Sequence, residues 1–216
     1  MTLPPHPDLV TWLGERLGRP LPGPEAHARM APFPARTDPA MISVEGKAGR
    51  QAAVLVLIYP LDEGGTPALV LTARQPSLRD HSGQVSLPGG SLDPGETPEQ
   101  AALREGHEEV GVPPGAPRLV GRLTPIFVPP SKFSVYPVVA ALDARPVFTV
   151  HEAEVAALIE VPLARLLDGA FRRTAPRTIF GKTYDVPVFD LDGFEVWGAT
   201  AMMLSELAAV LEEATG

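Results

Sequence analysis

Apolar and polar positions along this chain follow two periods, one typical of helices and one typical of strands. Residues 7–17 carry leucines four apart, as expected for a short amphipathic helix. Apolar runs at 52–59 and 68–73 flank the turn-forming segment 62–65, and this arrangement predicts a β-hairpin. Prolines recur every few residues over 20–39, so we expect an extended arm there.

The rest of the chain alternates between the same two patterns. The strongest helix is predicted over residues 97–110. Further elements are expected as strands at 118–128 and 133–143, a short helix at 162–168, a hairpin around Gly181 and Lys182, and a C-terminal helix over 198–213. Because the spacing is not that of regular βαβ units, we predict an α/β (α+β) fold with helices on both faces of a mixed β-sheet.

Composition narrows the class of protein. The 216 residues, 44% of them hydrophobic, suit one globular domain, and a formal charge of −8 disfavours nucleic acid and anionic membranes as partners. Cysteine is absent and the five histidines are scattered, so a metal would be held by oxygen ligands, which favours Mg²⁺ or Mn²⁺. No signal peptide is read, and the longest apolar run, 52–59, is shorter than the ~20 residues of a membrane span. We therefore expect a soluble, cytoplasmic protein.

The helix over 97–110 has clear signals at both ends. Thr97 is a good N-cap, and Gln100 completes a capping box with it. Gly111 closes the helix, and two prolines beyond it are stop signals.

Three carboxylates gather on one side of this helix. At about 100° per residue, Glu105, Glu108 and Glu109 fall within one sector of about 100°. Each like-charge pair costs a few tenths of a kcal/mol. The cluster is typical either of a divalent-cation site or of a solvated acidic face. Gly106 lies in the neighbouring sector, which is expected to face the core.

The spacing of these residues resembles the Nudix box, G-x5-E-x7-R-E-U-x-E-E-x-G-U, in which U is apolar. Every fixed position matches between Gly90 and Val112, and Gly106 is the one departure, at an apolar position. The resemblance implies a Nudix-type α/β/α sandwich. The resemblance covers about 70–200. With the pattern of the first 40 residues, we expect an N-terminal helix and proline-rich arm at 1–40, packed on the domain, and a Nudix hydrolase domain at 41–216.

The resemblance also implies roles for the acids. Glu105 and Glu109 would be the principal ligands of Mg²⁺ or Mn²⁺. Glu108 would be a further ligand or the group that orients the attacking water. Neutralising the charge of a phosphoanhydride and activating a water are tasks that clustered metal can perform.

Other positions of the box are expected to hold the site together. Glu96 and Arg104 would form an ion pair that fixes the loop on the helix, and Gly90 and Gly111 would be structural. With Glu105 and Glu108, Arg104 completes the expected catalytic set. Since glycine inside a helix costs about 1 kcal/mol relative to alanine, we expect Gly106→Ala to stabilise the protein.

A stretch upstream of the box resembles the additional signature of the coenzyme A branch of the Nudix hydrolases. The signature's two arginines, its glycine and its spacing are kept, and three other positions depart from it: Val70, Gln75 and Leu87. The expected substrate-binding residues are Arg74, Arg79, Gly89 and Gly90. Coenzyme A carries a pyrophosphate and a 3′-phosphate, which paired guanidinium groups would suit. The alternative is that the two arginines are surface residues on a strand end and a loop.

Two further features complete the comparison with this branch. Residues 196–201 resemble the segment that opens its last helix, and we interpret Trp197 there as a core residue. Glu152 and Glu154 lie where many Nudix enzymes place another carboxylate. The sequence leaves open which of the two has that role, and whether both belong to an exposed acidic loop.

The sequence thus predicts metal-dependent hydrolysis of a pyrophosphate bond in a small-molecule nucleotide. Coenzyme A or acyl-CoA would give 3′,5′-ADP and (acyl-)4′-phosphopantetheine. One alternative is a Nudix pyrophosphatase for ADP-ribose, dinucleotides or nucleoside triphosphates, and another is a non-catalytic module that senses a nucleotide. A homodimer is left open.

Overall fold

A hydrophobic run that is buried on both sides forms the centre of the fold. It is strand β1 (Arg50–Pro60), in which every residue from Leu55 to Tyr59 is fully buried. Successive side chains of a strand point to opposite faces. Leu55 therefore packs on one side of the sheet and Val56 on the other, and they belong to two separate hydrophobic clusters. A continuous apolar run, rather than an alternating one, is what a strand covered on both faces requires.

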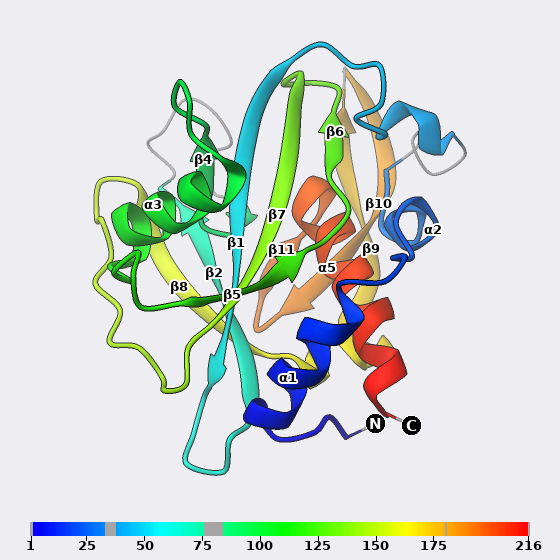
Figure 1. Ribbon diagram of the computed structural model, residues 1–216. Helices are drawn as coiled ribbons and strands as arrows, with labels where there is room; N and C mark the ends of the chain where they lie inside the picture. The colour runs from blue at the N-terminus through cyan, green and yellow to red at the C-terminus, as the bar shows by residue number, and fades with distance from the viewer. Residues whose placement is uncertain (1, 33–37, 76–83, 180, 216) are drawn as a thin grey trace.

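The computed structural model describes residues 2–32, 38–75, 84–179 and 181–215 (Figure 1). Its main sheet has eight strands in the order β3-β2-β1-β7-β5, with β4 paired to β1, β6 to β7 and β8 to β2. The other strands of this sheet are β2 (Pro67–Arg74), β3 (Val85–Ser86), β4 (Gly89–Ser91), β5 (Arg118–Arg122), β6 (Ile126–Val128), β7 (Phe133–Ala141) and β8 (Val155–Pro162). Strands β1 and β7 are parallel and the other pairs are antiparallel, so the sheet is mixed, as predicted.

Helices cover both faces of this sheet (Figure 1). They are α1 (His6–Arg16), α2 (Pro24–Ala28), α3 (Pro98–Val110), α4 (Ala164–Leu167) and α5 (Gly198–Glu212). Helix α3 lies alone on one face, while α1, α2 and α5 lie on the other. A smaller sheet lies next to α5. Its strands are β9 (Arg172–Ile179), β10 (Lys182–Leu191) and β11 (Phe194–Val196). None of the helices in the described ranges is long and apolar enough to cross a bilayer.

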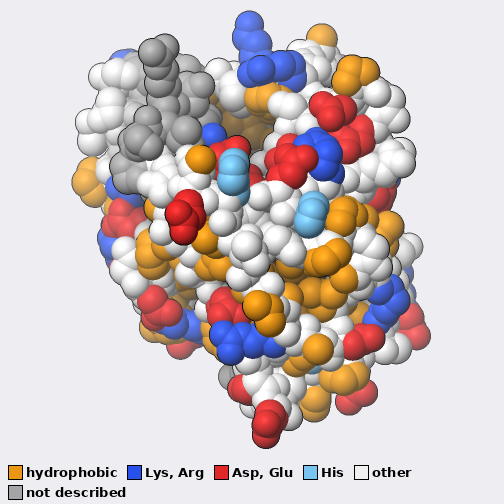
Figure 2. Space-filling view, turned by 90° about the vertical axis from the view of Figure 1, so that its left-hand side faces the viewer, with side chains coloured by type: hydrophobic (Ala, Val, Ile, Leu, Met, Phe, Trp, Pro, Cys, Tyr) orange, Lys and Arg blue, Asp and Glu red, His pale blue; other side chains and the backbone are white. Residues whose placement is uncertain are grey.

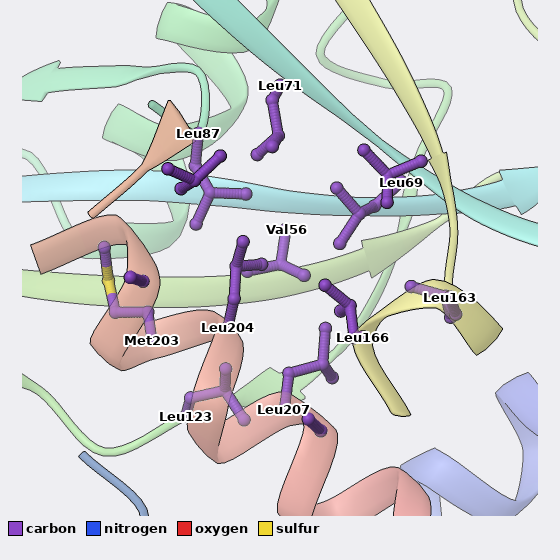
Figure 3. Packing of buried hydrophobic residues seen from close by; sticks show 14 of the residues in the cluster. Val56, Leu69, Leu71, Leu87, Leu123, Leu163, Leu166, Met203, Leu204 and Leu207 are labelled. Carbon is purple, nitrogen blue, oxygen red and sulfur yellow. The ribbon is translucent and has the colours of Figure 1, made fainter. Parts of the chain in front are cut away.

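The larger hydrophobic cluster lies between the sheet and α5. Figure 3 shows Val56 and Leu69 from the sheet facing Leu204 and Leu207 of α5. Leu87, which stands where the coenzyme A signature has phenylalanine, is also buried in this cluster. That departure therefore exchanges one core residue for another.

Several sequence predictions are confirmed. The β1–β2 hairpin, helix α3, the β9–β10 hairpin and the C-terminal helix all form where the pattern placed them. Others need correction. The segment 20–39 is not extended throughout, because α2 and a 3₁₀ turn at Pro39–Met41 interrupt it. The strand expected at 118–128 is two strands, β5 and β6, and strand β8 was missed.

The structure changes what we expect of Gly106. A Cβ added at this position would lie 2.5 Å from Leu55 Cδ2 on β1. Atoms that close must move apart, and Leu55 is fully buried. The glycine thus permits α3 to approach the sheet closely.

Candidate active site

Local signals place the helix that carries the acids. The Thr97 hydroxyl accepts a hydrogen bond from Gln100 N (3.3 Å), and Gln100 Oε1 accepts one from Thr97 N (2.9 Å), so the capping box is present. Gly111 ends α3 with φ of 76°, in the left-handed region that glycine adopts easily. The helix start and end therefore follow from the sequence itself.

The loop before α3 is tied to the helix by one ion pair. Arg104 donates from Nε and Nη2 to the two carboxylate oxygens of Glu96, at 3.0 Å each. Its Nη2 also donates to Ser91 O at 3.0 Å. Hydrogen bonds from Arg104 lower the pKa of Glu96 below its ordinary value of 4.5. The structure thus brings Glu96 and Arg104 together in the arrangement that the Nudix resemblance implied.

Glu105 lies beneath this loop. The Glu105 side chain is 15% exposed and accepts a hydrogen bond from Arg104 Nη1 at 2.8 Å. A Cβ on Gly90 would overlap the Glu105 carboxylate, so the glycine lets the loop cross this side chain without displacing it. Gly89 is held equally close to the backbone of β1. The glycines of the loop therefore serve close approach to Glu105 and to the sheet.

Glu109 is the most buried of the three clustered acids of α3, at 6% exposure. Its Oε2 accepts a hydrogen bond from Thr72 Oγ1 at 3.3 Å, and the backbone N–H of Gly89 also donates to its carboxylate. Burial, supported by the negative charges of Glu105 and Glu154, raises the pKa of Glu109 from 4.5 to about 7. A buried carboxylate with acidic neighbours needs positive charge to remain ionised.

Glu108 differs from the other two acids in its exposure. Its side chain is 55% exposed, and its nearest charged partner is Arg104 at 3.3 Å. It lies on the same helix as Glu105 and Glu109 but at the solvent edge of the cluster. Such a side chain is free to meet a ligand or a water.

The sequence left Glu152 and Glu154 as equal candidates, and the structure separates them. His151 N donates to Glu109 O at 3.1 Å, which holds this segment against the end of α3. Gln75, the residue that follows β2, supports it by donating from its backbone N to Glu154 O at 2.8 Å. The negative charge of Glu154 contributes to raising the pKa of both Glu105 and Glu109. Glu154 is therefore the stronger of the two candidates for a further carboxylate near the acids of α3.

Of the two signature arginines, Arg74 lies in the described part of the chain and Arg79 lies outside it. Arg74 ends β2, two residues after Thr72, at a β-bulge in the pairing of β2 with β8. Within the described residues Arg74 forms no ion pair, and its buried Nε has no hydrogen-bond partner. A guanidinium without a counter-charge thus lies on the strand that contacts Glu109.

The donor set fits a hard divalent cation. All the candidate ligands are carboxylate oxygens, which Mg²⁺ and Mn²⁺ prefer. Glu109 has no cationic side chain beside it in the described residues, and its raised pKa shows that its charge is not compensated. No three metal-binding side chains meet closely enough in the described ranges to form a ready-made cluster, and Glu105 is instead hydrogen-bonded to Arg104. A cation would compete with Arg104 for this carboxylate.

Comparisons with known proteins agree with this fold. Residues 49–179 match the family described as the NUDIX domain. A protein of Escherichia coli O7:K1 described as the uncharacterized Nudix hydrolase NudL is 39% identical over 162 residues, which cover 74% of this chain and 81% of that protein. A NudL of Salmonella paratyphi B gives the same values.

A solved structure shows the same fold. The Nudix hydrolase RenU of M. smegmatis superposes with a TM-score of 0.55 at 23% identity, covering 80% of this chain and 94% of that one. A mixed sheet with helices on both faces and a helix rich in acids are features of a Nudix pyrophosphohydrolase. The chain belongs to the Nudix hydrolase family. Members of this family generally use divalent metals such as Mg²⁺ or Mn²⁺.

Proposed function

We propose that this enzyme hydrolyses coenzyme A or acyl-CoA to 3′,5′-ADP and (acyl-)4′-phosphopantetheine. The observation that carries the proposal is Arg74, whose guanidinium forms no ion pair with the described residues and which ends the strand whose Thr72 contacts Glu109. Coenzyme A differs from other nucleoside diphosphate derivatives by its 3′-phosphate. An arginine near the pyrophosphate site supplies a charge-assisted contact to such a group. The signature that contains Arg74 also resembles that of the coenzyme A branch.

The residues of α3 suit the chemistry of this reaction. Water adds to one phosphorus of the pyrophosphate, the bridging P–O bond breaks, and each product leaves with a phosphate. Glu105 and Glu109 would hold Mg²⁺ or Mn²⁺. The bound cation would neutralise the pyrophosphate and lower the pKa of the attacking water.

Glu108 or Glu154 would accept the proton of that water. Glu108 is exposed at the edge of the cluster, and Glu154 faces it from the segment before β8. The ion pair between Glu96 and Arg104 would keep the loop and helix in one arrangement during turnover. Arg104 acts in this proposal as a positioning residue, because its guanidinium is occupied by Glu96, Glu105 and the backbone of the loop.

The test is a panel of substrates with products identified by mass. Coenzyme A, acetyl-CoA, dephospho-CoA, ADP-ribose, NADH and a nucleoside triphosphate would each be incubated with Mg²⁺ and with Mn²⁺. The proposal expects the highest kcat/KM for coenzyme A or its acyl form, with 3′,5′-ADP as a product. A higher kcat/KM for ADP-ribose or a dinucleotide would contradict it.

A further inference from the structure

A cavity of about 450 Å³ opens near the acids, on the α5 side of the main sheet. Its walls come from β3, from the chain after β6, from the end of β9 and from the start of α5. Residues that represent these walls are Val85, Ser86, Pro130, Ile179, Trp197 and Ala199. The volume lies within the range of about 300–1,000 Å³ that is typical of small-molecule sites.

The wall of the cavity and Glu109 both contact the same buried side chain, Thr72. Thr72 Oγ1 lies 3.3 Å from Glu109 Oε2 and 3.5 Å from Ser86 Oγ, and Ser86 is part of the cavity wall. From Ser86 the chain continues directly into Gly89, whose N–H contacts Glu109. Figure 2 shows a hollow with hydrophobic side chains at its base, opening beside a group of acidic side chains. A molecule whose phosphates lie at the acids can therefore extend into the cavity.

The lining decides which end of a substrate can enter. The described residues around the cavity include no Asp, Glu, Lys or Arg, and most of them are hydrophobic. A phosphate placed there would lose its hydration without gaining a counter-charge, which is strongly unfavourable. The charged side chains of the site, Arg74 and the acids of α3, all lie outside the lining. The cavity therefore suits an uncharged, largely apolar group.

We propose that this cavity binds the pantetheine arm of the substrate together with an attached acyl group. The inference rests on the proposed function and adds to it that acyl-CoA is preferred over free coenzyme A. The phosphates remain at the acids and Arg74, while the arm passes Ser86 and reaches Trp197 and Ala199.

The first test varies the acyl chain. Burial of each methylene strengthens binding by up to about fourfold, so kcat/KM should rise along the series coenzyme A, acetyl-, butanoyl- and hexanoyl-CoA until the cavity is full. Cleavage of coenzyme A with a flat dependence on chain length would overturn the cavity proposal and leave the proposed function intact.

The second test fills the cavity. Ala199→Leu should remove the gain from longer acyl chains and leave ADP-ribose cleavage, where it occurs, unchanged. Ala164→Leu is the matched control, because Ala164 is an exposed residue at the start of α4 and lies outside the cavity. Ser131→Leu narrows the cavity from a different segment, so that the result does not depend on the folding of one variant. An equal loss on hexanoyl-CoA and ADP-ribose would assign the cavity to the nucleoside and overturn the proposal.

The third test needs neither metal nor turnover. Trp12 and Trp197 are the two tryptophans of the chain, so Trp12→Phe leaves Trp197 as the single tryptophan. S-hexanoylpantetheine, which carries no phosphate, should change the fluorescence of Trp197 saturably, and Ala199→Leu should abolish the change. If coenzyme A is not cleaved but this binding is seen, the proposed function fails and the cavity site stands. If neither is seen, both fail.

Discussion

Leu55 on β1 packs against the backbone of Gly106 in α3, so that a methyl group on the glycine would lie 2.5 Å from Leu55 Cδ2. This contact lies one residue from Glu105 along the helix. The distance between the acids and the sheet therefore depends on a residue that has no side chain.

Gly106→Ala is expected to destabilise the protein. The substitution gains about 1 kcal/mol of helix propensity. Overpacking against a buried side chain costs roughly 1–3 kcal/mol. We expect a net loss of up to about 2 kcal/mol, which lowers the melting temperature of a domain of this size by a few degrees.

Gly14 offers a matched control for this substitution. It lies inside helix α1, and a Cβ there would meet nothing within 4 Å. Gly14→Ala should therefore raise the melting temperature in the same calorimetric experiment. A rise of equal size for both variants would show that Leu55 moves aside without cost.

The contrast between these two glycines shows what a sequence can and cannot predict. The ends of α3 were predicted correctly because Thr97, Gln100 and Gly111 are local signals. The contact of Gly106 with Leu55 depends on how α3 docks on β1, and nothing in the helix sequence carries that information. The same reason explains β8, where pairing with β2 overrides a run of alanine and leucine that favours a helix.

Part of the candidate site could likewise be predicted from the sequence, and part could not. The acids of the box share one helix face, so their proximity follows from their spacing. The position of the segment 152–154 beside α3 depends on the bonds of Gln75 and His151, which join three distant segments. The cavity beside Ser86 is likewise built from several separate segments of the chain, which only the folded structure brings together.

Metal binding should depend on pH through Glu109. Burial and acidic neighbours raise the pKa of this carboxyl to about 7. A carboxyl with a raised pKa favours the folded state while protonated. Without metal, stability should fall as pH rises from 4.5 to about 7, by at most a few kcal/mol. Because Mg²⁺ needs the ionised form, its affinity should rise over the same interval. Thermal unfolding with and without Mg²⁺ at several pH values measures both trends, and a Mg²⁺ affinity that is constant across this interval would contradict the prediction.

Glu109→Gln should separate folding from catalysis. The amide keeps the shape of the side chain but removes a ligand charge, and we expect activity to fall by roughly 10² or more. In metal-free protein above pH 7 the variant should be at least as stable as the wild type, since it no longer buries an ionised carboxylate. Circular dichroism, calorimetry and turnover at saturating Mg²⁺ test these points. A folded variant with half of the wild-type turnover would exclude Glu109 as a metal ligand.

Arg74→Ala should weaken binding of coenzyme A more than that of dephospho-CoA. A charge-assisted hydrogen bond contributes roughly 1.5–3 kcal/mol, so KM for coenzyme A should rise by about tenfold or more. Arg118→Ala is the control, because Arg118 is an exposed arginine on β5, away from the acids. Equal losses on the two substrates would place Arg74 at the pyrophosphate instead of the 3′-phosphate.

The buried Glu206 of α5 joins the N-terminal segment to the rest of the domain. It accepts hydrogen bonds from Gly23 N at 2.9 Å, from Thr124 N at 2.9 Å and from Thr124 Oγ1 at 2.6 Å. It also lies 3.2 Å from His27 Nε2. Burial alone would raise the pKa of Glu206, but the hydrogen bonds from His27 and Thr124 outweigh it and lower the pKa below 4.5.

Glu206→Gln should therefore destabilise the protein in a pH-dependent way. The amide nitrogen would face donors that the carboxylate now satisfies, and leaving them unpaired costs roughly 1–3 kcal/mol. Because the folded pKa is lowered, the wild-type advantage should be complete above pH 4.5 and should disappear as pH falls below it. Glu212→Gln on the same helix is the control, since Glu212 is 38% exposed and its pair with Arg29 is worth little. Urea unfolding of the three proteins on both sides of pH 4.5 measures the difference, and a Glu206→Gln variant as stable as Glu212→Gln at neutral pH would show that this network does not stabilise the fold.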